Sequence, residues 1–155
     1  MTTSFADFVA TQDARNDIKL KVREYCLMLC DALEQNFVEE SIKRQKFFAA
    51  TGNAEYHNSR IEAIKNGEDL YKFYIESGRK YHKIIMETES GSRSVHCFVD
   101  MKTGEVYKAA SFKAPAKDVR FNLLIINERE FVLENCDWAG GYLYKNASYD
   151  ENKYG

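Results

Sequence analysis

Apolar residues recur every three or four positions in the first third of the chain, which is the spacing of one face of an α-helix. The pattern predicts a helix over residues 13–35, with helix continuing or resuming over 38–50 and ending near Gly52. Ser4 and Asp7 flank a short first turn ahead of it. The predicted apolar face consists of Ile18, Val22, Tyr25, Cys26, Leu29 and Leu33.

Capping residues indicate two further helices. Asn53 is placed to cap a helix that runs to about residue 65, where Gly67 suits the end. Near the C-terminus, Asn127 and Glu130 have the spacing of a capping box, which predicts a short helix to about residue 135.

Between these helices the pattern changes to short runs rich in β-branched and aromatic residues, which are typical of strands. Two runs, residues 94–100 and 105–111, flank a turn in which Asp100 can accept backbone N–H bonds and Gly104 can adopt the left-handed conformation. With the preceding runs they form a three- to four-stranded antiparallel meander. The preceding strands are predicted over residues 69–76 and 80–88.

Strict alternation along the middle strand divides its side chains between the two faces of the sheet. Val95, Cys97 and Val99 are expected on one face, and His96 and Phe98 on the other. Neither set is fully polar, so we expect helices on one face of the sheet and partial cover on the other.

The order of these elements predicts an α+β fold, with N-terminal helices packed on an antiparallel β-meander, then a short C-terminal helix and strand. The final strand, or an aromatic clasp in its place, is expected over residues 138–144, with Trp138 largely buried against the sheet. We expect a single domain, residues 1–155, with a helical part at 1–67, a meander part at 68–144 and a mobile tail at 145–155.

Composition restricts the class of protein. Hydrophobic residues make up 45% of the chain and aromatic residues 14%, which is typical of an ordered globular protein. No apolar stretch approaches the length of a membrane span, and the N-terminus lacks the pattern of a secretory signal. The four cysteines are therefore expected to be reduced thiols.

Positive charge is concentrated in the middle of the chain. Residues 79–120 contain nine Lys or Arg against five Asp or Glu, whereas the segments before and after each contain three more acidic than basic residues. Basic side chains interleaved with aromatic ones are suited to phosphate contacts and base stacking, although lysines that solvate strands and loops give the same pattern. The candidate residues for binding nucleic acid or a protein partner are Arg79, Lys83, Arg93, Lys108, Phe112, Lys113, Lys117 and Arg120.

No catalytic or metal-binding motif accompanies this basic segment. Cys26 and Cys30 share a helix face but lack the further ligands that a metal site requires, so we expect them in the core. His82 and His96 fall in neighbouring predicted strands, where a histidine could activate Cys97 as a nucleophile. Adjacent strand residues point to opposite faces, however, so His96 and Cys97 are not expected to pair with each other. We therefore expect no enzyme activity, no cofactor and no bound metal.

The β-rich part of the chain contains the run RSVHCFVDMKTGEVYKAASFKAPAKDVRFNLL, preceded by GRKYHKII and followed by DWAGGYLY. This pattern resembles a group of small uncharacterised proteins of tailed bacteriophages, especially marine and cyanobacterial ones. The resemblance covers about residues 78–144 and does not extend to the helical N-terminus. It implies a viral protein that acts in the bacterial host cytoplasm or in the virion, and it supplies no activity and no site residues.

Two functions are therefore expected. The first is a non-enzymatic phage accessory protein that binds nucleic acid or a host protein through a basic surface at residues 79–120. The alternative is a structural or assembly component of the virion that acts through oligomerisation. A contiguous positive surface favours the first function, and a contiguous apolar patch favours the second.

Overall fold

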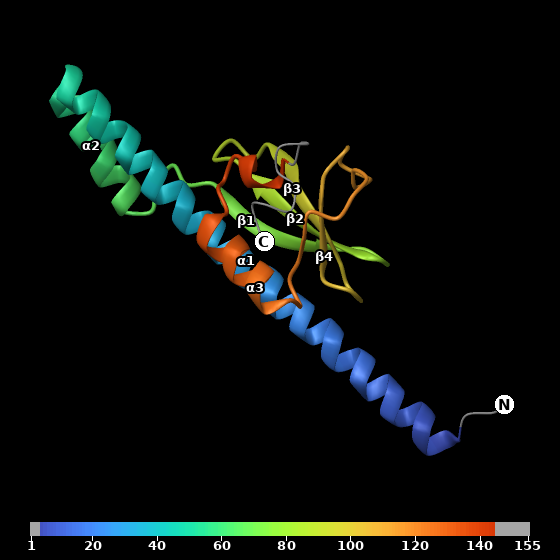
Figure 1. Ribbon diagram of the computed structural model, residues 1–155. Helices are drawn as coiled ribbons and strands as arrows, with labels where there is room; N and C mark the ends of the chain where they lie inside the picture. Colours follow the sequence, from blue (N-terminus) through green and yellow to red (C-terminus); the bar gives the residue numbers. More distant parts are fainter. Residues whose placement is uncertain (1–3, 145–155) are drawn as a thin grey trace.

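The protein has an α+β fold in which one very long helix lies along a five-stranded antiparallel sheet (Figure 1). The computed structural model describes residues 4–144, so the expected tail at 145–155 lies outside the described residues. The predicted fold class is confirmed: N-terminal helices pack on a β-meander, and a short helix follows it.

Helix α1 (Phe5–Thr51) is continuous for 47 residues, about 70 Å, and spans both of the helical stretches predicted at 13–35 and 38–50. It contains neither proline nor glycine, so no backbone break occurs where its apolar periodicity fades. The Ser4 hydroxyl oxygen accepts a bond from the Asp7 N–H at 3.1 Å, so this pair begins α1 and not a separate short turn. Its buried residues are Val22, Cys26, Leu29, Cys30, Leu33 and Phe37.

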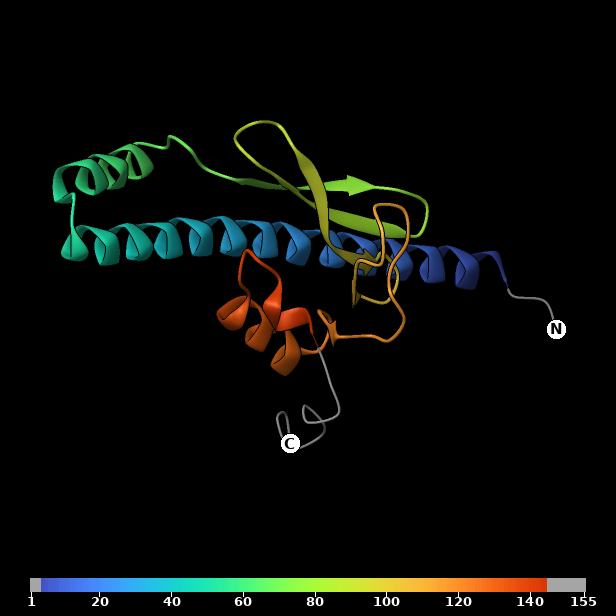
Figure 2. The ribbon, with the colours of Figure 1, turned by 90° about the horizontal axis from the view of Figure 1, so that it is seen from above.

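Both ends of α1 extend beyond the sheet (Figure 2). Residues 5–21 contain no buried side chain, and Ile18, which was expected on the apolar face, is 40% exposed. At the other end, helix α2 (Ala54–Lys65) folds back on α1. The predicted side-chain cap at Asn53 is wrong, because this residue has a left-handed φ of 50° that turns the chain and its side chain makes no capping bond.

The sheet is a meander in which each strand pairs with the next. Its strands are β1 (Lys72–Ser77), β2 (Tyr81–Glu87), β3 (Arg93–Asp100), β4 (Glu105–Lys108) and β5 (Phe121–Asn122). It therefore has one strand more than the upper end of the three to four predicted, and β4 ends at Lys108 instead of continuing to residue 111. A two-residue strand such as β5 is too short to show alternation, so the sequence pattern could not indicate it.

A bulge in β3 changes the side-chain directions that strict alternation predicts. Ile84 pairs with Cys97 and Ile85 pairs with Val95, which leaves His96 as an extra residue in the ladder. His96 therefore shares the face of Cys97, and its ring packs edge-on against a buried phenylalanine of β1. The prediction that His96 and Cys97 point to opposite faces is wrong, because alternation holds only along an uninterrupted ladder.

The turn between β3 and β4 forms as predicted. One carboxylate oxygen of Asp100 accepts bonds from the N–H groups of Lys102, at 2.8 Å, and Thr103, at 3.1 Å. Gly104 has a φ of +75°, and a Cβ placed there would lie 2.9 Å from Cγ of Leu124. Glycine is thus required both by the backbone conformation and by the close approach of the chain that follows β5.

The C-terminal segment packs against α1. Helix α3 (Ile126–Asn135) forms as predicted, but Asn127 lies inside it and no side chain caps its first turn. The segment predicted as a final strand instead contains the 3₁₀ turn η1 (Gly141–Leu143), so the alternative of an aromatic clasp describes it better. Trp138 is half-buried, less than expected; it packs against the core and lines a cavity with Met86 and Val95 of the sheet. Its ring also contacts those of Phe37 on α1 and Tyr71 before β1.

The hydrophobic core lies between α1, the sheet and α3, and it includes all four cysteines. Cys26 and Cys30 are buried on one face of α1, as the four-residue spacing predicted. Burial raises the pKa of both thiols to about 12, which keeps them protonated at neutral pH. Within residues 4–144, no group of His, Cys, Asp and Glu side chains is arranged to hold a metal ion.

Candidate nucleic-acid interface

Aromatic side chains form a row on the face of the sheet that points away from α1, which we call the outer face. Lys83, Phe98 and Tyr107 are direct cross-strand partners and therefore lie side by side on it. Tyr81 packs edge-on against two of them, with ring centroids 5.7 Å from Phe98 and 6.0 Å from Tyr107. The side chains that we assign to the outer face are Tyr74, Tyr81, Lys83, Arg93, Phe98, Tyr107 and Phe112.

The loop between β4 and β5 places Phe112 on the outer face. The Lys83 Nζ lies 4.6 Å from the centre of the Phe112 ring, and the Arg93 Cζ lies 5.7 Å from it. Phe112 as a whole residue remains 41% exposed. A partly exposed aromatic residue thus lies near two cations, each within the range of a cation–π interaction.

The structure brings together Lys83, Arg93 and Phe112 from the predicted set, and it places Arg79 and Lys108 elsewhere. Arg79 is exposed in the turn between β1 and β2. Lys108 lies against a different ring, with its Nζ 4.4 Å from the centre of Tyr144. The two predicted lysines that are exposed on the loop are Lys113 and Lys117.

Arg120 differs from the other candidates because it is half-buried. Its backbone N–H donates to the carbonyl of Val106 at 2.7 Å. Its side-chain Nε is buried and has no hydrogen-bond partner within residues 4–144. Removing this side chain would disturb the packing under the loop, so Arg120 is unsuited to a test of surface contacts.

Carboxylates reduce the net positive charge of the outer face. Arg93 forms an ion pair with Glu76. The hydroxyl of Tyr74 donates to the Glu87 carboxylate at 3.0 Å. The outer face therefore offers aromatic rings and hydrogen-bonding groups more than unbalanced charge.

The two strand histidines do not form a common site. His82 is buried with its Nδ1 2.7 Å from the Ser77 hydroxyl, and burial, with a smaller effect of Arg23, lowers its pKa. The Nε2 of His96 lies 2.7 Å from the Tyr142 hydroxyl, and the ring borders a cavity of about 290 Å³. Burial lowers the pKa of His96 to about 4, so the ring is neutral at pH 7.

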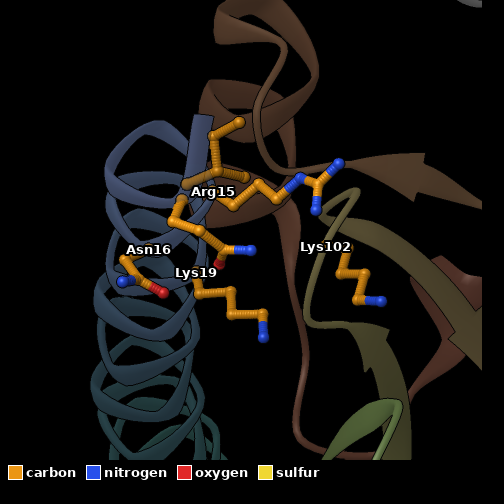
Figure 3. Close-up of a pocket in the computed structure, with 6 residues that line it drawn as sticks. Arg15, Asn16, Lys19 and Lys102 are labelled. Carbon is orange, nitrogen blue, oxygen red and sulfur yellow. The ribbon is translucent and has the colours of Figure 1, made fainter. Parts of the chain in front are cut away.

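A second basic group, which was not predicted, combines two residues of α1 with one lysine of the basic segment. Arg15 and Lys19 of α1 and Lys102 of the β3–β4 turn line a cleft of about 420 Å³ (Figure 3). The four-residue spacing of Arg15 and Lys19 shows in the sequence that they share a side of a helix. Only the fold reveals that Lys102 lies across from them.

None of the helices within the described residues, α1 included, is both long and apolar enough to cross a membrane. Helix α1 is long enough for this, but charged residues recur along its whole length, so it is not apolar enough.

Comparison with known proteins places the chain in a wider group. Residues 5–145 match a protein family described as "Family of unknown function (DUF7717)". The match includes α1 as well as the β-rich part of the chain. No curated protein and no solved structure matches the chain.

Proposed function

Since the chain belongs to DUF7717, a family of unknown function, we propose from its geometry that it binds single-stranded nucleic acid through the outer face and catalyses no reaction. The observation that carries the proposal is the partly exposed Phe112, whose ring centre lies 4.6 Å from Nζ of Lys83 and 5.7 Å from Cζ of Arg93. A role as an accessory protein of a tailed phage, acting in the host cytoplasm, is part of the proposal and rests on the resemblance of residues 78–144.

Stacking is the interaction that the outer face supports best. Proteins hold single strands by stacking bases on aromatic rings and by placing cations near the phosphates, and each stacked base contributes about 1–3 kcal/mol. Phe112 offers an accessible ring, and Tyr74 and Tyr81 extend the aromatic surface over neighbouring strands. A duplex keeps the faces of its bases covered, so a single strand fits this surface better.

We expect labelled single-stranded oligonucleotides to bind at about 50 mM salt and to bind more weakly as the salt concentration rises, because binding releases counterions. Phe112→Ala should weaken binding about 5- to 150-fold, which corresponds to the loss of one stacked base. Lys83→Gln should reduce the slope of log affinity against log salt by about one. Fluorescence anisotropy measures both effects.

Phe47→Ala and Lys46→Gln are matched controls, because both residues are exposed on α1 away from the outer face. Lys113→Ala combined with Lys117→Ala tests the exposed part of the loop, and Arg120 is left unchanged because it is half-buried. The proposal is contradicted if the wild-type protein shows no binding at roughly tens of micromolar, or if the controls lose as much affinity as Phe112→Ala.

A structural or assembly role in the virion is the second candidate, and the N-terminal end of α1 favours it. Phe5, Phe8 and Val9 have the three- and four-residue spacing of one helix side, and they are 82%, 53% and 39% exposed. This end of the helix projects past the sheet (Figure 2). An apolar helix side in such a position is suited to packing against another copy of the chain.

If this end of α1 mediates assembly, light scattering should show a defined oligomer of the wild-type protein. Phe5→Ala combined with Phe8→Ala should shift the oligomer to monomer, because each lost phenyl group removes apolar area worth about 25 cal/mol per Å². Phe47→Ala, which removes an exposed ring at the other end of α1, should leave the oligomer intact. If the wild-type protein is monomeric at about 100 μM, its dissociation constant is weaker than that of a stable oligomer, and the assembly role is contradicted.

A further inference from the structure

We propose that the cleft between the N-terminal part of α1 and the β3–β4 turn binds phosphate groups through Arg15, Lys19 and Lys102. This site goes beyond the function proposed above, since none of its residues belongs to the outer face.

The cleft has a volume of about 420 Å³, which is enough for more than one phosphate group. Arg15 and Lys19 extend from α1 on the side where the turn presents Lys102 (Figure 3). The remaining lining residues are Gln12, Asn16 and Ile18.

The two cations of α1 occupy the side of the helix that faces the rest of the protein. Lys19 precedes the buried residues Val22 and Cys26 by three and seven positions, so with 3.6 residues per turn it lies on their side of the helix. Arg15 lies one turn further toward the N-terminus on the same side. Basic residues thus replace apolar ones where α1 leaves the core and passes the β3–β4 turn.

Negative charge is kept away from this side of α1. Asp13 and Asp17 are each two positions from Arg15, which places them about 200° around the helix axis from it. Within the described part of the chain, no Asp or Glu lines the cleft, and Arg15, Lys19 and Lys102 take part in none of the ion pairs. The cleft therefore holds three positive charges without a counter-charge from residues 4–144.

The carboxylate nearest to Lys102 along the chain, that of Asp100, already accepts hydrogen bonds from the backbone. Asp100 is buried, and one of its carboxylate oxygens accepts the backbone N–H groups of Lys102 and Thr103. This bonding holds the turn that presents the Lys102 side chain to the cleft. The carboxylate thus shapes the site and does not extend into it as a counter-ion.

Phosphate is the anion that these side chains recognise best. Cations held in one cleft repel each other, and a bound anion removes that repulsion. A guanidinium group can bond two phosphate oxygens at once, while the ammonium groups supply compact charge and the amides of Gln12 and Asn16 supply further donors. Within residues 4–144, no aromatic residue lines the cleft, so the ligand is recognised by its phosphates and not by a base. The ligand is therefore a polyphosphate or consecutive phosphates of a nucleic-acid backbone.

Titration calorimetry of the full chain with inorganic tripolyphosphate tests the site directly. We expect the wild-type protein to bind, and Arg15→Gln combined with Lys19→Gln to lower the affinity at least about tenfold. Lys102→Gln should lower the affinity as well, because the turn then presents no cation. Circular dichroism should be unchanged, since the substituted side chains are exposed.

Lys21→Gln is the matched control for the loss of charge. Lys21 is exposed on α1 two positions from Lys19, hence about 200° around the helix and directed away from the cleft. Its substitution should change the affinity by less than about twofold. An equal loss in Lys21→Gln and in the double variant would overturn the proposal, as would the absence of tripolyphosphate binding to the wild-type protein at about 1 mM.

A second titration with single-stranded oligonucleotide distinguishes the two sources of phosphate. If the cleft holds backbone phosphates, the Arg15 and Lys19 double variant weakens oligonucleotide and tripolyphosphate binding together. If it holds a free polyphosphate, only the affinity for tripolyphosphate falls. Phe112→Ala should leave tripolyphosphate binding unchanged, so a failure of the outer face and a failure of the cleft can be told apart.

Discussion

Gly104→Val is expected to lower the free energy of unfolding by roughly 3 kcal/mol, because it combines backbone strain with a collision. Gly104 has a φ of +75°, a conformation that β-branched residues strongly disfavour. A Cβ at this position would lie 2.9 Å from Cγ and 3.3 Å from the backbone nitrogen of Leu124. The leucine side chain can move, but its backbone is held by the turn after β5. Urea denaturation at neutral pH measures the loss.

Gly91→Val separates the two effects, since Gly91 has a similar φ of +87° and, apart from its chain neighbours, no atom of residues 4–144 lies within 4 Å of its Cβ position. The control should lose only about 1–2 kcal/mol, which is the cost of strain alone. Equal losses in the two variants would show that the approach of Leu124 to the turn is not tight. A loss in Gly104→Val well below about 1 kcal/mol would contradict the turn conformation itself.

Acidification between about pH 6.5 and pH 4 is expected to destabilise the protein through His96. The unfolded chain takes up a proton near the usual pKa of 6.5, whereas burial lowers the pKa of the folded histidine to about 4. The native state therefore binds fewer protons in this range, so the free energy of unfolding decreases as the pH falls. A difference of this size corresponds to about 3 kcal/mol, all of it present above pH 6.5 and lost once the pH is below about 4.

His96→Gln isolates this contribution, because glutamine can still bond the Tyr142 hydroxyl but does not titrate. Denaturant unfolding measured from pH 7 to pH 4 should show a flatter pH dependence in the variant than in the wild-type protein. The chemical shift of the His96 ring protons, followed by NMR, should also stay constant down to about pH 5. Equal pH dependence of the two proteins would show that His96 is accessible to protons in the native state.

Features that depend on residues close together along the chain could be predicted from the sequence. The β3–β4 turn is one, because the Asp100 carboxylate accepts the N–H groups of the turn and Gly104, four positions later, adopts the positive φ that the turn requires. The burial of Cys26 and Cys30 is another, because residues four apart share a helix side wherever that helix lies. Both depend on contacts between close neighbours along the chain.

The full extent of α1 and the bulge at His96 could not be predicted in this way. Apolar spacing marks only the part of α1 that the sheet covers, and beyond it the helix continues because no proline or glycine ends it. The bulge depends on how β3 pairs with β2, so the side-chain directions in β3 follow from a second strand and not from its own residues.

The candidate sites show the same division between local and distant contacts. Composition and spacing were enough to indicate an α+β fold, a meander and a segment rich in basic and aromatic residues, because periodicity and turn chemistry act over a few positions. They could not show that Phe112 lies close to both Lys83 and Arg93, or that Lys102 faces Arg15 across a cleft. Those groupings join residues far apart in the chain, and they exist only once the strand register and the packing of α1 have brought the segments together.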